Sequence, residues 1–317
     1  MSAAEVNLSE SLKEAHISQY EEENEIKLWR QLQGTDGFQR AEILLQLAQE
    51  AVRSSRGNEA LAYAEEANQI YTSMGANAPN IDLANSWMVI GDSYQELNSV
   101  DEAVKAMDKA IEYLKEGNYP FVTDTLRNKG HLLARNKRYV EALGCYLEIV
   151  RINEIDGDPE FIAKDLLSVT YCFMKMEQWD AVIQHAERAR YYAKTAKQVD
   201  DVTWCDMYLA DAYAELGSFN FAIDLAGSVV AMANLRELHQ TKCLARLTLG
   251  KALIALADYE SAERELLGAR EIASTSQDWE TISKIENEFV NLYLVQGKSE
   301  LALEIKSRLD SLREIVA

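Results

Sequence analysis

The chain has 317 residues and a formal net charge of −20 at pH 7; 48% of its residues are hydrophobic and 26% are charged. This composition excludes an intrinsically disordered chain, and the negative charge disfavours nucleic acids and anionic membranes as partners, because both would repel the protein. No apolar run approaches the ~20 residues that span a bilayer, and the acidic start of the sequence is unlike a secretory signal, so we predict a cytoplasmic protein.

Residues 1–39 form an N-terminal segment that does not share the pattern of the rest of the chain. Within it, Ile26, Trp29 and Leu32 recur at helical spacing, which predicts a helix over about residues 20–33. The sequence GTDG at 34–37 ends this helix, because glycine is favoured just beyond helix ends. We expect the helix to cap the apolar face of the structure that follows, with a detachable partner-binding arm as the alternative.

Residues 87–110, WMVIGDSYQELNSVDEAVKAMDKA, predict two antiparallel helices joined by a polar turn. Large residues at Trp87, Ile90 and Tyr94 lie on one face of the first helix, because they are spaced three and four positions apart. The small residue Gly91 lets the second helix approach closely, while the large residues fill the space beside it. The stretch therefore predicts one tightly packed helix hairpin.

The same pattern recurs seven times in constant phase. The small residue of the second helix recurs at intervals of 43, 39, 40, 40, 40 and 40 residues, at Ala60, Ala103, Ala142, Val182, Ala222, Ala262 and Ala302. The second copy resembles the tetratricopeptide repeat, W-x2-L-G-x2-Y followed by A-x3-F, with Ile90 in place of Leu and Met107 in place of Phe. The likeness covers about residues 40–317, although the period is longer than the family's usual 34 residues.

The resemblance implies an all-α fold, a right-handed superhelical solenoid of about seven helix hairpins preceded by an N-terminal cap helix. The N-terminal segment would comprise residues 1–39 and the solenoid residues 40–317. The predicted repeats span residues 40–78, 79–118, 119–157, 158–197, 198–237, 238–277 and 278–317.

Motifs for catalysis and metal binding are missing from the sequence. The histidines lie far apart without metal-ligand spacing, and no phosphate-binding loop or nucleophile elbow is present. We therefore predict a non-enzymatic protein without cofactor or metal. The cysteines lie 27, 33 and 38 residues apart, a spacing that favours buried free thiols over disulfides or metal ligands: Cys145, Cys172, Cys205 and Cys243.

Tetratricopeptide solenoids bind partners on their concave side, which the first helix of each pair lines. In the family's register, the central repeats of this chain place basic and aromatic residues in that groove. Arginine and lysine can grip carboxylates or phosphates, and aromatic rings can receive apolar side chains. We therefore predict a site for an acidic or C-terminal peptide segment, comprising Arg127, Asn128, His131, Arg135, Lys164, Tyr171, Lys175, Trp204, Tyr208 and Asp211.

A ladder of ion pairs between adjacent repeats is the alternative interpretation of these charges. Glu96 would pair with Arg135, and Lys175 with Asp211 or Glu215. The ladder would then continue to Lys251. Each exposed pair would contribute about 0–1 kcal/mol to stability. The two interpretations are compatible, because a ladder can open to a charged ligand.

The last helix carries more apolar residues than closing its own hairpin requires. Ile305, Leu309, Leu312 and Val316 form one stripe, which we expect to self-associate with a second copy, giving a homodimer. A slightly apolar end without a partner is the alternative.

These observations favour an adaptor or receptor that binds a peptide, or an extended or helical protein segment, in its concave groove. A structural scaffold that mainly self-associates through its terminal repeats is the second hypothesis.

Overall fold

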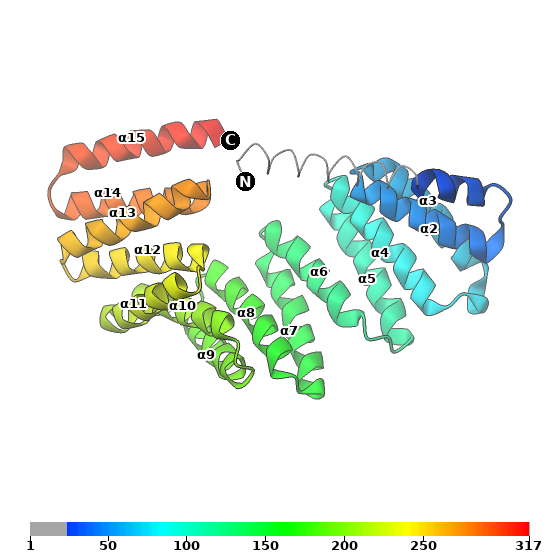
Figure 1. Ribbon diagram of the computed structural model, residues 1–317, viewed down its shortest axis with the longest axis horizontal. Coiled ribbons are helices and arrows are strands. Elements are labelled where there is room, and N and C mark those ends of the chain that lie inside the picture. Colours follow the sequence, from blue (N-terminus) through cyan, green and yellow to red (C-terminus); the bar gives the residue numbers. More distant parts are fainter. Residues whose placement is uncertain (1–23, 317) are drawn as a thin grey trace, which may run out of the picture. The chain divides into compact units, whose positions relative to one another are not determined.

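The predicted all-α fold is confirmed by the computed structural model, which describes residues 24–316. Over that range the chain consists of α-helices, one 3-10 helix (η1, Gly75–Asn77) and the turns between them (Figure 1). The helices form two compact units, Met1–Arg138 and Tyr139–Ala317. We call these the N-terminal unit and the C-terminal unit and describe each by itself.

Besides a short helix over residues 24–32, the N-terminal unit is built from two hairpins and one further helix. Their bounds are α2 (Gly37–Arg53), α3 (Gly57–Ser73), α4 (Asn80–Glu96), α5 (Val100–Glu116) and α6 (Val122–Arg135). The core between these helices contains small and branched side chains in alternation, such as Leu44, Ala48, Ala64 and Ile90, and this alternation allows the helices to pack closely.

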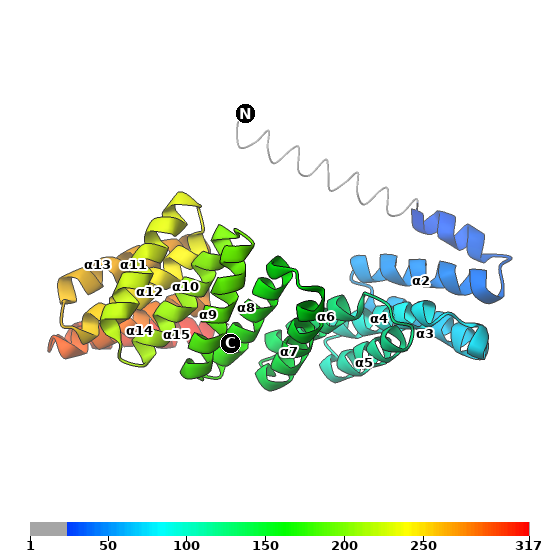
Figure 2. The same ribbon diagram turned by 90° about the horizontal axis from the view of Figure 1, so that it is seen from below.

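The predicted cap helix is present over residues 24–32 and lies alongside the first hairpin (Figures 1 and 2). Leu28 and Leu32 are buried in the same core as α2 and α3. The ring of Trp29 meets Tyr63 edge-on, with 5.7 Å between the ring centroids. Arg56 Nη2 lies 2.7 Å from Glu25 Oε2. Apolar contacts and an ion pair therefore fix this helix on the end of the solenoid.

The C-terminal unit contains the longer part of the solenoid. Its helices are α7 (Tyr139–Asp156), α8 (Pro159–Lys175), α9 (Trp179–Thr195), α10 (Val199–Glu215), α11 (Phe219–Leu235), α12 (His239–Ala255), α13 (Tyr259–Thr275), α14 (Trp279–Val295) and α15 (Ser299–Val316). Helices α8, α10, α12 and α14 contact one another in series and form an inner row. Each packs against the outer helix that follows it in the chain, from α9 to α15.

The turns within and between the hairpins repeat one backbone geometry. In the turn after α8, Glu177 has a φ of 57°, and the next residue, Gln178, donates its N–H to the carbonyl oxygen of Phe173 at 3.0 Å. This bond satisfies a carbonyl at the helix end that would otherwise lack a partner. The recurrence of the same bond after most helices gives the hairpins a uniform geometry.

Glycine marks the closest approach of paired helices, as the sequence predicts. A Cβ atom added at Gly250 of α12 would lie 2.6 Å from Cγ and Cδ2 of Leu266 on α13. One added at Gly91 of α4 would lie 3.3 Å from Cγ of Met107 on α5. The four cysteines are buried free thiols, and burial raises the pKa of Cys172 to about 12.

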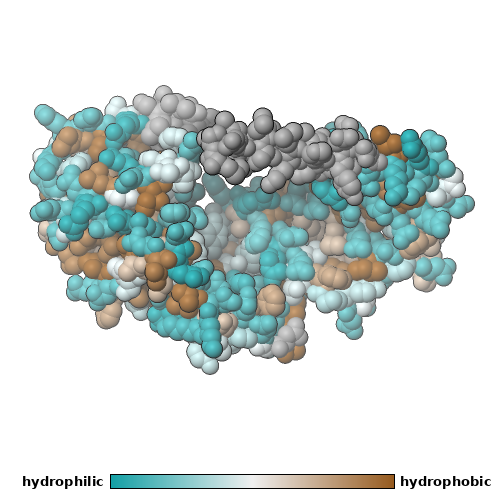
Figure 3. Space-filling view, viewed as in Figure 1, coloured by the Kyte–Doolittle hydropathy of each residue, from teal (hydrophilic) through white to brown (hydrophobic). Residues whose placement is uncertain are grey.

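The outer face of the C-terminal unit mixes polar with apolar side chains. Figure 3 shows hydrophobic side chains scattered among hydrophilic ones over the outer helices. Phe221 and Leu235 of α11 are 66% and 78% exposed. Within residues 24–316, no helix is long and apolar enough to cross a membrane.

Candidate functional site

A pocket of about 670 Å³ lies along the inner row of the C-terminal unit. Its walls come from α8, α10, α12 and α14, the turns before α9 and α14, and the first residue of α9. We call it the inner pocket, and its lining residues are Tyr171, Met174, Lys175, Glu177, Trp179, Trp204, Met207, Tyr208, Asp211, Glu215, Gln240, Leu244, Leu247, Thr248, Lys251, Asp278, Glu280, Thr281, Lys284 and Glu288.

The pocket crosses the inner helices diagonally. From α8 it takes residues of the C-terminal half, such as Tyr171 and Lys175, whereas from α14 it takes residues of the N-terminal half, such as Lys284. Lys284 is related to Lys164 on α8 by three steps of 40 residues in the sequence. Repeat-equivalent positions therefore differ in whether they reach the pocket, because adjacent inner helices are not in line with one another.

Aromatic rings and aliphatic side chains form one wall. Trp204 and Tyr208 of α10 lie one turn apart, with ring centroids 5.9 Å from each other. Tyr171 of α8 meets Tyr139 edge-on at 6.4 Å between centroids. Burial raises the pKa of Tyr208 well above its ordinary value, so its hydroxyl stays protonated at neutral pH. This wall can accept an apolar side chain or the face of a planar group.

The three lysines of the pocket form ion pairs with two carboxylates. Lys175 Nζ of α8 lies 3.2 Å from Glu280 Oε1 of α14, 105 residues away in sequence. Lys284 Nζ lies 2.8 Å from the same oxygen. Hydrogen bonding to Lys284 and the charges of both lysines lower the pKa of Glu280 to about 2. The third lysine, Lys251, pairs with Glu215.

Asp211 lies on the same face of α10 as the aromatic wall. Its Oδ1 atom accepts a hydrogen bond of 3.4 Å from the hydroxyl of Thr248. Among the residues that the structure describes, no cation forms an ion pair with this carboxylate. Burial and the charge of Glu215 raise the pKa of Asp211, while the charges of Lys251 and Lys284 and the hydrogen bond from Thr248 oppose the rise. The pocket therefore holds a partly buried carboxyl group without a positive neighbour in contact.

The structure brings five of the predicted binding residues together. Tyr171, Lys175, Trp204, Tyr208 and Asp211 all line the inner pocket. The position of these residues within the pocket does not test their role in binding, which remains a prediction.

Lys164, also predicted for this site, does not line the inner pocket. It is exposed on α8, and its Nζ atom lies 2.6 Å from Glu160 Oε1, one turn earlier on the same helix.

The remaining predicted residues lie on α6 of the N-terminal unit. Asn128, His131 and Arg135 are exposed, whereas Arg127 is half-buried. Arg127 Nη1 lies 2.9 Å from Oδ1 of Asp124. Burial and the charges of Arg127 and Arg135 lower the pKa of His131, which favours its neutral form.

The ion-pair ladder takes a different form from the one predicted. Arg135 donates to the amide oxygen of Gln95 at 3.2 Å, beside Glu96. Lys175 reaches past α10 and α12 to Glu280 of α14. The predicted step of the ladder to Lys251 is present, because Lys251 pairs with Glu215 of the preceding repeat.

Sequence reasoning missed the contribution of α14 to the pocket. Glu280, Lys284 and Glu288 repeat at intervals of four residues, so they share one helical face. The family's register that places Tyr171 and Lys175 in the groove instead places Asn291 and Val295 of α14 there, three and seven residues beyond Glu288. The i, i+4 charge pattern could have indicated an exposed stripe, but nothing local shows that it faces α8.

The apolar stripe of the last helix is partly used within the C-terminal unit. Ile305 and Leu309 are buried in the core with Ile285 and Phe289 of α14, so neither is available to a second copy. Leu312 and Val316, predicted to belong to the same surface, lie outside the side chains that the structure describes.

A metal centre has no candidate within residues 24–316, because no three His, Cys, Asp or Glu side chains gather as ligands there.

Comparison with known proteins identifies the type of solenoid. Residues 84–113, which include the hairpin motif at Trp87, match the sequence model of a tetratricopeptide repeat. No curated protein matches the chain in sequence. The predicted superfamily is confirmed by this repeat and by the fold: the chain is a solenoid of tetratricopeptide-like helix hairpins.

Several solved structures share this fold at low sequence identity. A Signal Transduction ATPase with Numerous Domains, which has a tetratricopeptide repeat sensor and comes from Pyrococcus horikoshii, is 18% identical with a TM-score of 0.65. The match covers 88% of this chain and 43% of that protein, so the chain spans less than half of its length. A Rap protein complexed with competence and sporulation factor is 16% identical, with a TM-score of 0.56 and 85% and 75% of the two chains covered.

A third structure of this type is the protein BtubC from P. vanneervenii, which is 16% identical with a TM-score of 0.51. That match covers 75% of this chain and 93% of the other. At these identities the likeness establishes the fold alone.

Proposed function

We propose that this protein is a non-enzymatic interaction module that holds a peptide, or an extended or helical protein segment, in the groove formed by its inner helices. The inner pocket is the observation that carries the proposal. Its aromatic and aliphatic wall offers apolar contact, while the paired charges around it offer hydrogen bonds to a backbone or to polar side chains.

The make-up of the pocket favours binding over chemistry. Its lysines are held in ion pairs with Glu215 and Glu280, so each is engaged with a carboxylate of the pocket wall rather than with a reacting group. The Rap protein with this fold was solved as a complex with competence and sporulation factor, which supports a receptor or adaptor role for a solenoid of this fold.

The two units differ in the partner charge that their residues favour. On α6 of the N-terminal unit, the exposed side chain of Arg135 supports the acidic segment predicted from the sequence. In the C-terminal unit the inner pocket contains six carboxylates and three lysines. The proposal of an acidic partner therefore rests on α6 alone.

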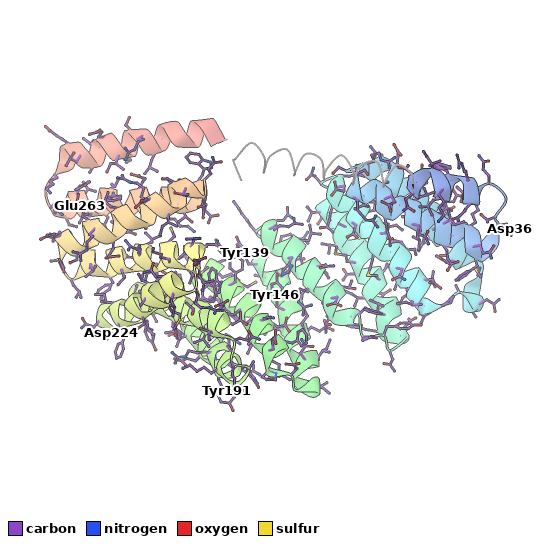
Figure 4. The ribbon with its side chains drawn as sticks, viewed as in Figure 1. Asp36, Tyr139, Tyr146, Tyr191, Asp224 and Glu263 are labelled. Carbon is purple, nitrogen blue, oxygen red and sulfur yellow. The ribbon has the colours of Figure 1, made fainter. Side chains whose placement is uncertain are left out.

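Selection from a random peptide library displayed on phage tests the proposal directly. The full chain is used as bait beside a double variant, Trp204→Ala with Tyr208→Ala, that removes the aromatic wall. A matched control is Tyr191→Ala, because Tyr191 is 68% exposed on the outer edge of α9 (Figure 4).

We expect sequences enriched by the wild type to bind the Tyr191→Ala variant equally well and to bind the double variant at least tenfold more weakly. This loss is consistent with removing two large aromatic contacts from a binding site. Equal binding to all three proteins would refute the assignment of the inner pocket, and a library without any enriched sequence would refute peptide binding.

Self-assembly remains the second proposal, since Leu301 and Leu303 on α15 are 44% and 66% exposed. Sedimentation velocity at micromolar concentration tests it. A strictly monomeric protein would argue against this function, and a concentration-dependent dimer that Leu303→Asp abolishes would support it.

A further inference from the structure

The lysines of the inner pocket are all paired with carboxylates, but its carboxylates are not all paired with lysines. Each of the three lysines is paired, and these pairs use only Glu215 and Glu280. Asp278 is also engaged, because its side chain caps α14 and accepts hydrogen bonds from the backbone and hydroxyl of Thr281. A surplus of negative charge is therefore left in the pocket, beside the aromatic wall.

Among the acidic residues that line the pocket, Asp211 is the closest in sequence to that wall. It follows Tyr208 by three residues and Trp204 by seven, so all three side chains share one face of α10. Its Oδ1 atom accepts a 3.4 Å hydrogen bond from the hydroxyl of Thr248. A buried carboxylate is costly unless a charge or several hydrogen bonds compensate it. A cation supplied by a ligand would provide that compensation.

Tyr171, a neighbouring ring of the same wall, shows that these rings can accept a cation. Lys175 Nζ lies 5.4 Å from the centroid of the Tyr171 ring while it also pairs with Glu280. Aromatic rings attract cations through their electron-rich faces, and indole does so best. Trp204 and Asp211 offer the same combination, a ring and a carboxylate, and within residues 24–316 no cation forms an ion pair with Asp211.

We propose that the inner pocket binds a basic side chain, an arginine or a lysine, of the segment held in the groove, with Asp211 as its counter-ion and Trp204 and Tyr208 as its aromatic walls. This inference rests on the proposed function. An acidic side chain at the same place would meet the unpaired carboxylate and would have to displace Lys251 from Glu215. The fit of charges therefore favours a basic residue.

The experiment uses the peptides that the full wild-type chain selects from the random phage library. We expect arginine or lysine to be enriched at one fixed position of the selected sequences. Selected sequences without any basic preference, or with an acidic one, would overturn this inference and leave peptide binding itself established. The absence of any selected sequence would instead refute the proposed function on which the inference depends.

A charge-removal cycle then locates the contact. A selected peptide is synthesised with its enriched arginine or with citrulline, which has the same shape without the charge. Both peptides are titrated by calorimetry into the wild type, Asp211→Asn and the control Asp224→Asn. Asp224 is exposed on the outer helix α11 (Figure 4), so this control changes the net charge equally outside the pocket.

We expect citrulline to weaken binding to the wild type and to Asp224→Asn by about tenfold, the effect of removing a charge-assisted hydrogen bond. For Asp211→Asn the two peptides should differ by less than about threefold, because the counter-ion is gone. An equal citrulline effect in all three proteins would overturn the assignment of Asp211. The comparison of peptides on the wild type needs no variant, so a folding defect in Asp211→Asn cannot hide the charge preference.

Discussion

Replacing Gly250 by alanine tests whether close helix approach controls the stability of this solenoid. The added methyl group would lie 2.6 Å from two carbon atoms of Leu266, whose side chain has no exposed surface. Gly227 on α11 offers a matched comparison, because a Cβ atom there has no neighbour within 4 Å. Both glycines lie inside helices of the C-terminal unit, so the same gain in helix propensity applies to both substitutions.

The magnitudes follow from two opposing effects. Alanine stabilises a helix interior by about 1 kcal/mol relative to glycine. Overpacking a filled core costs about 1–3 kcal/mol. Gly227→Ala should therefore raise the free energy of unfolding by about 1 kcal/mol, whereas Gly250→Ala should lower it by about 1 kcal/mol. The expected difference between the two variants is about 2 kcal/mol.

Urea denaturation followed by circular dichroism measures both values against the wild type, and hydrogen exchange in α12 and α13 shows whether the loss is local. In a third variant, Leu266→Ala removes the obstructing side chain. Adding Gly250→Ala to this variant should then be neutral or stabilising, because the methyl group enters the vacated space. If Gly250→Ala is as stable as Gly227→Ala, the argument from close approach is refuted.

Three further predictions concern pH, turns and a buried ion pair. Burial raises the pKa of Asp92 from 3.8 to about 6, so the folded chain holds this proton more tightly, and the free energy of unfolding should fall as pH rises from about 4 to about 6. Asp92→Asn should therefore stabilise the protein at pH 7 by up to about 3 kcal/mol and should have no such effect at pH 4; a pH-independent difference in urea titrations would contradict this. Ala257 has a φ of 62°, so Ala257→Gly should raise thermal stability by about 0.5–1 kcal/mol, whereas Gly217→Ala, at a φ of 77°, should lower it by about 1 kcal/mol; the same sign for both would rule out backbone strain as the cause. Glu286 is buried and lies 2.8 Å from Arg308 of α15, so Glu286→Gln should weaken the docking of this helix by about 1–2 kcal/mol and speed its hydrogen exchange, and unchanged exchange in α15 would contradict the role of the pair.

The sequence predicted the hairpins well because their determinants are local. The spacing of Trp87, Ile90 and Tyr94 encodes one helical face, and Gly91 and Gly250 mark where a second helix must come close. The turns are local as well, since each needs only a residue that tolerates a positive φ. Periodicity and small residues therefore sufficed to predict the fold and the cap helix.

The composition of the pocket was harder to predict, because it depends on how successive hairpins rotate relative to one another. Tyr171 and Asp211 were placed in the groove by their register on α8 and α10. Glu280 was not, because its contact with Lys175 joins residues 105 positions apart. The small rotations between successive hairpins add up over three hairpins, and the total rotation cannot be inferred from any short segment of the sequence. The acidic surplus of the pocket depends on those distant residues.

Burial within the last helix could not be inferred from its apolar stripe alone. Ile305 and Leu309 have the spacing of an exposed interface as much as that of a core. Their burial depends on Phe289 and its neighbours on α14, which leave room for both side chains. A helical pattern shows which residues share a face, whereas the neighbouring helix decides whether solvent covers that face.

The contact between Lys175 and Glu280 has an evolutionary consequence. It joins the first and last of the four inner helices that line the inner pocket. The width of the pocket between these two helices therefore corresponds to a whole number of repeats. Gain or loss of one repeat by unequal recombination would separate these two side chains and change the width of the pocket in a single step. Each hairpin would keep its own core. The size of ligand that such a solenoid accepts can therefore change during evolution through the number of repeats. The residues that contact the ligand's side chains need not change at the same time.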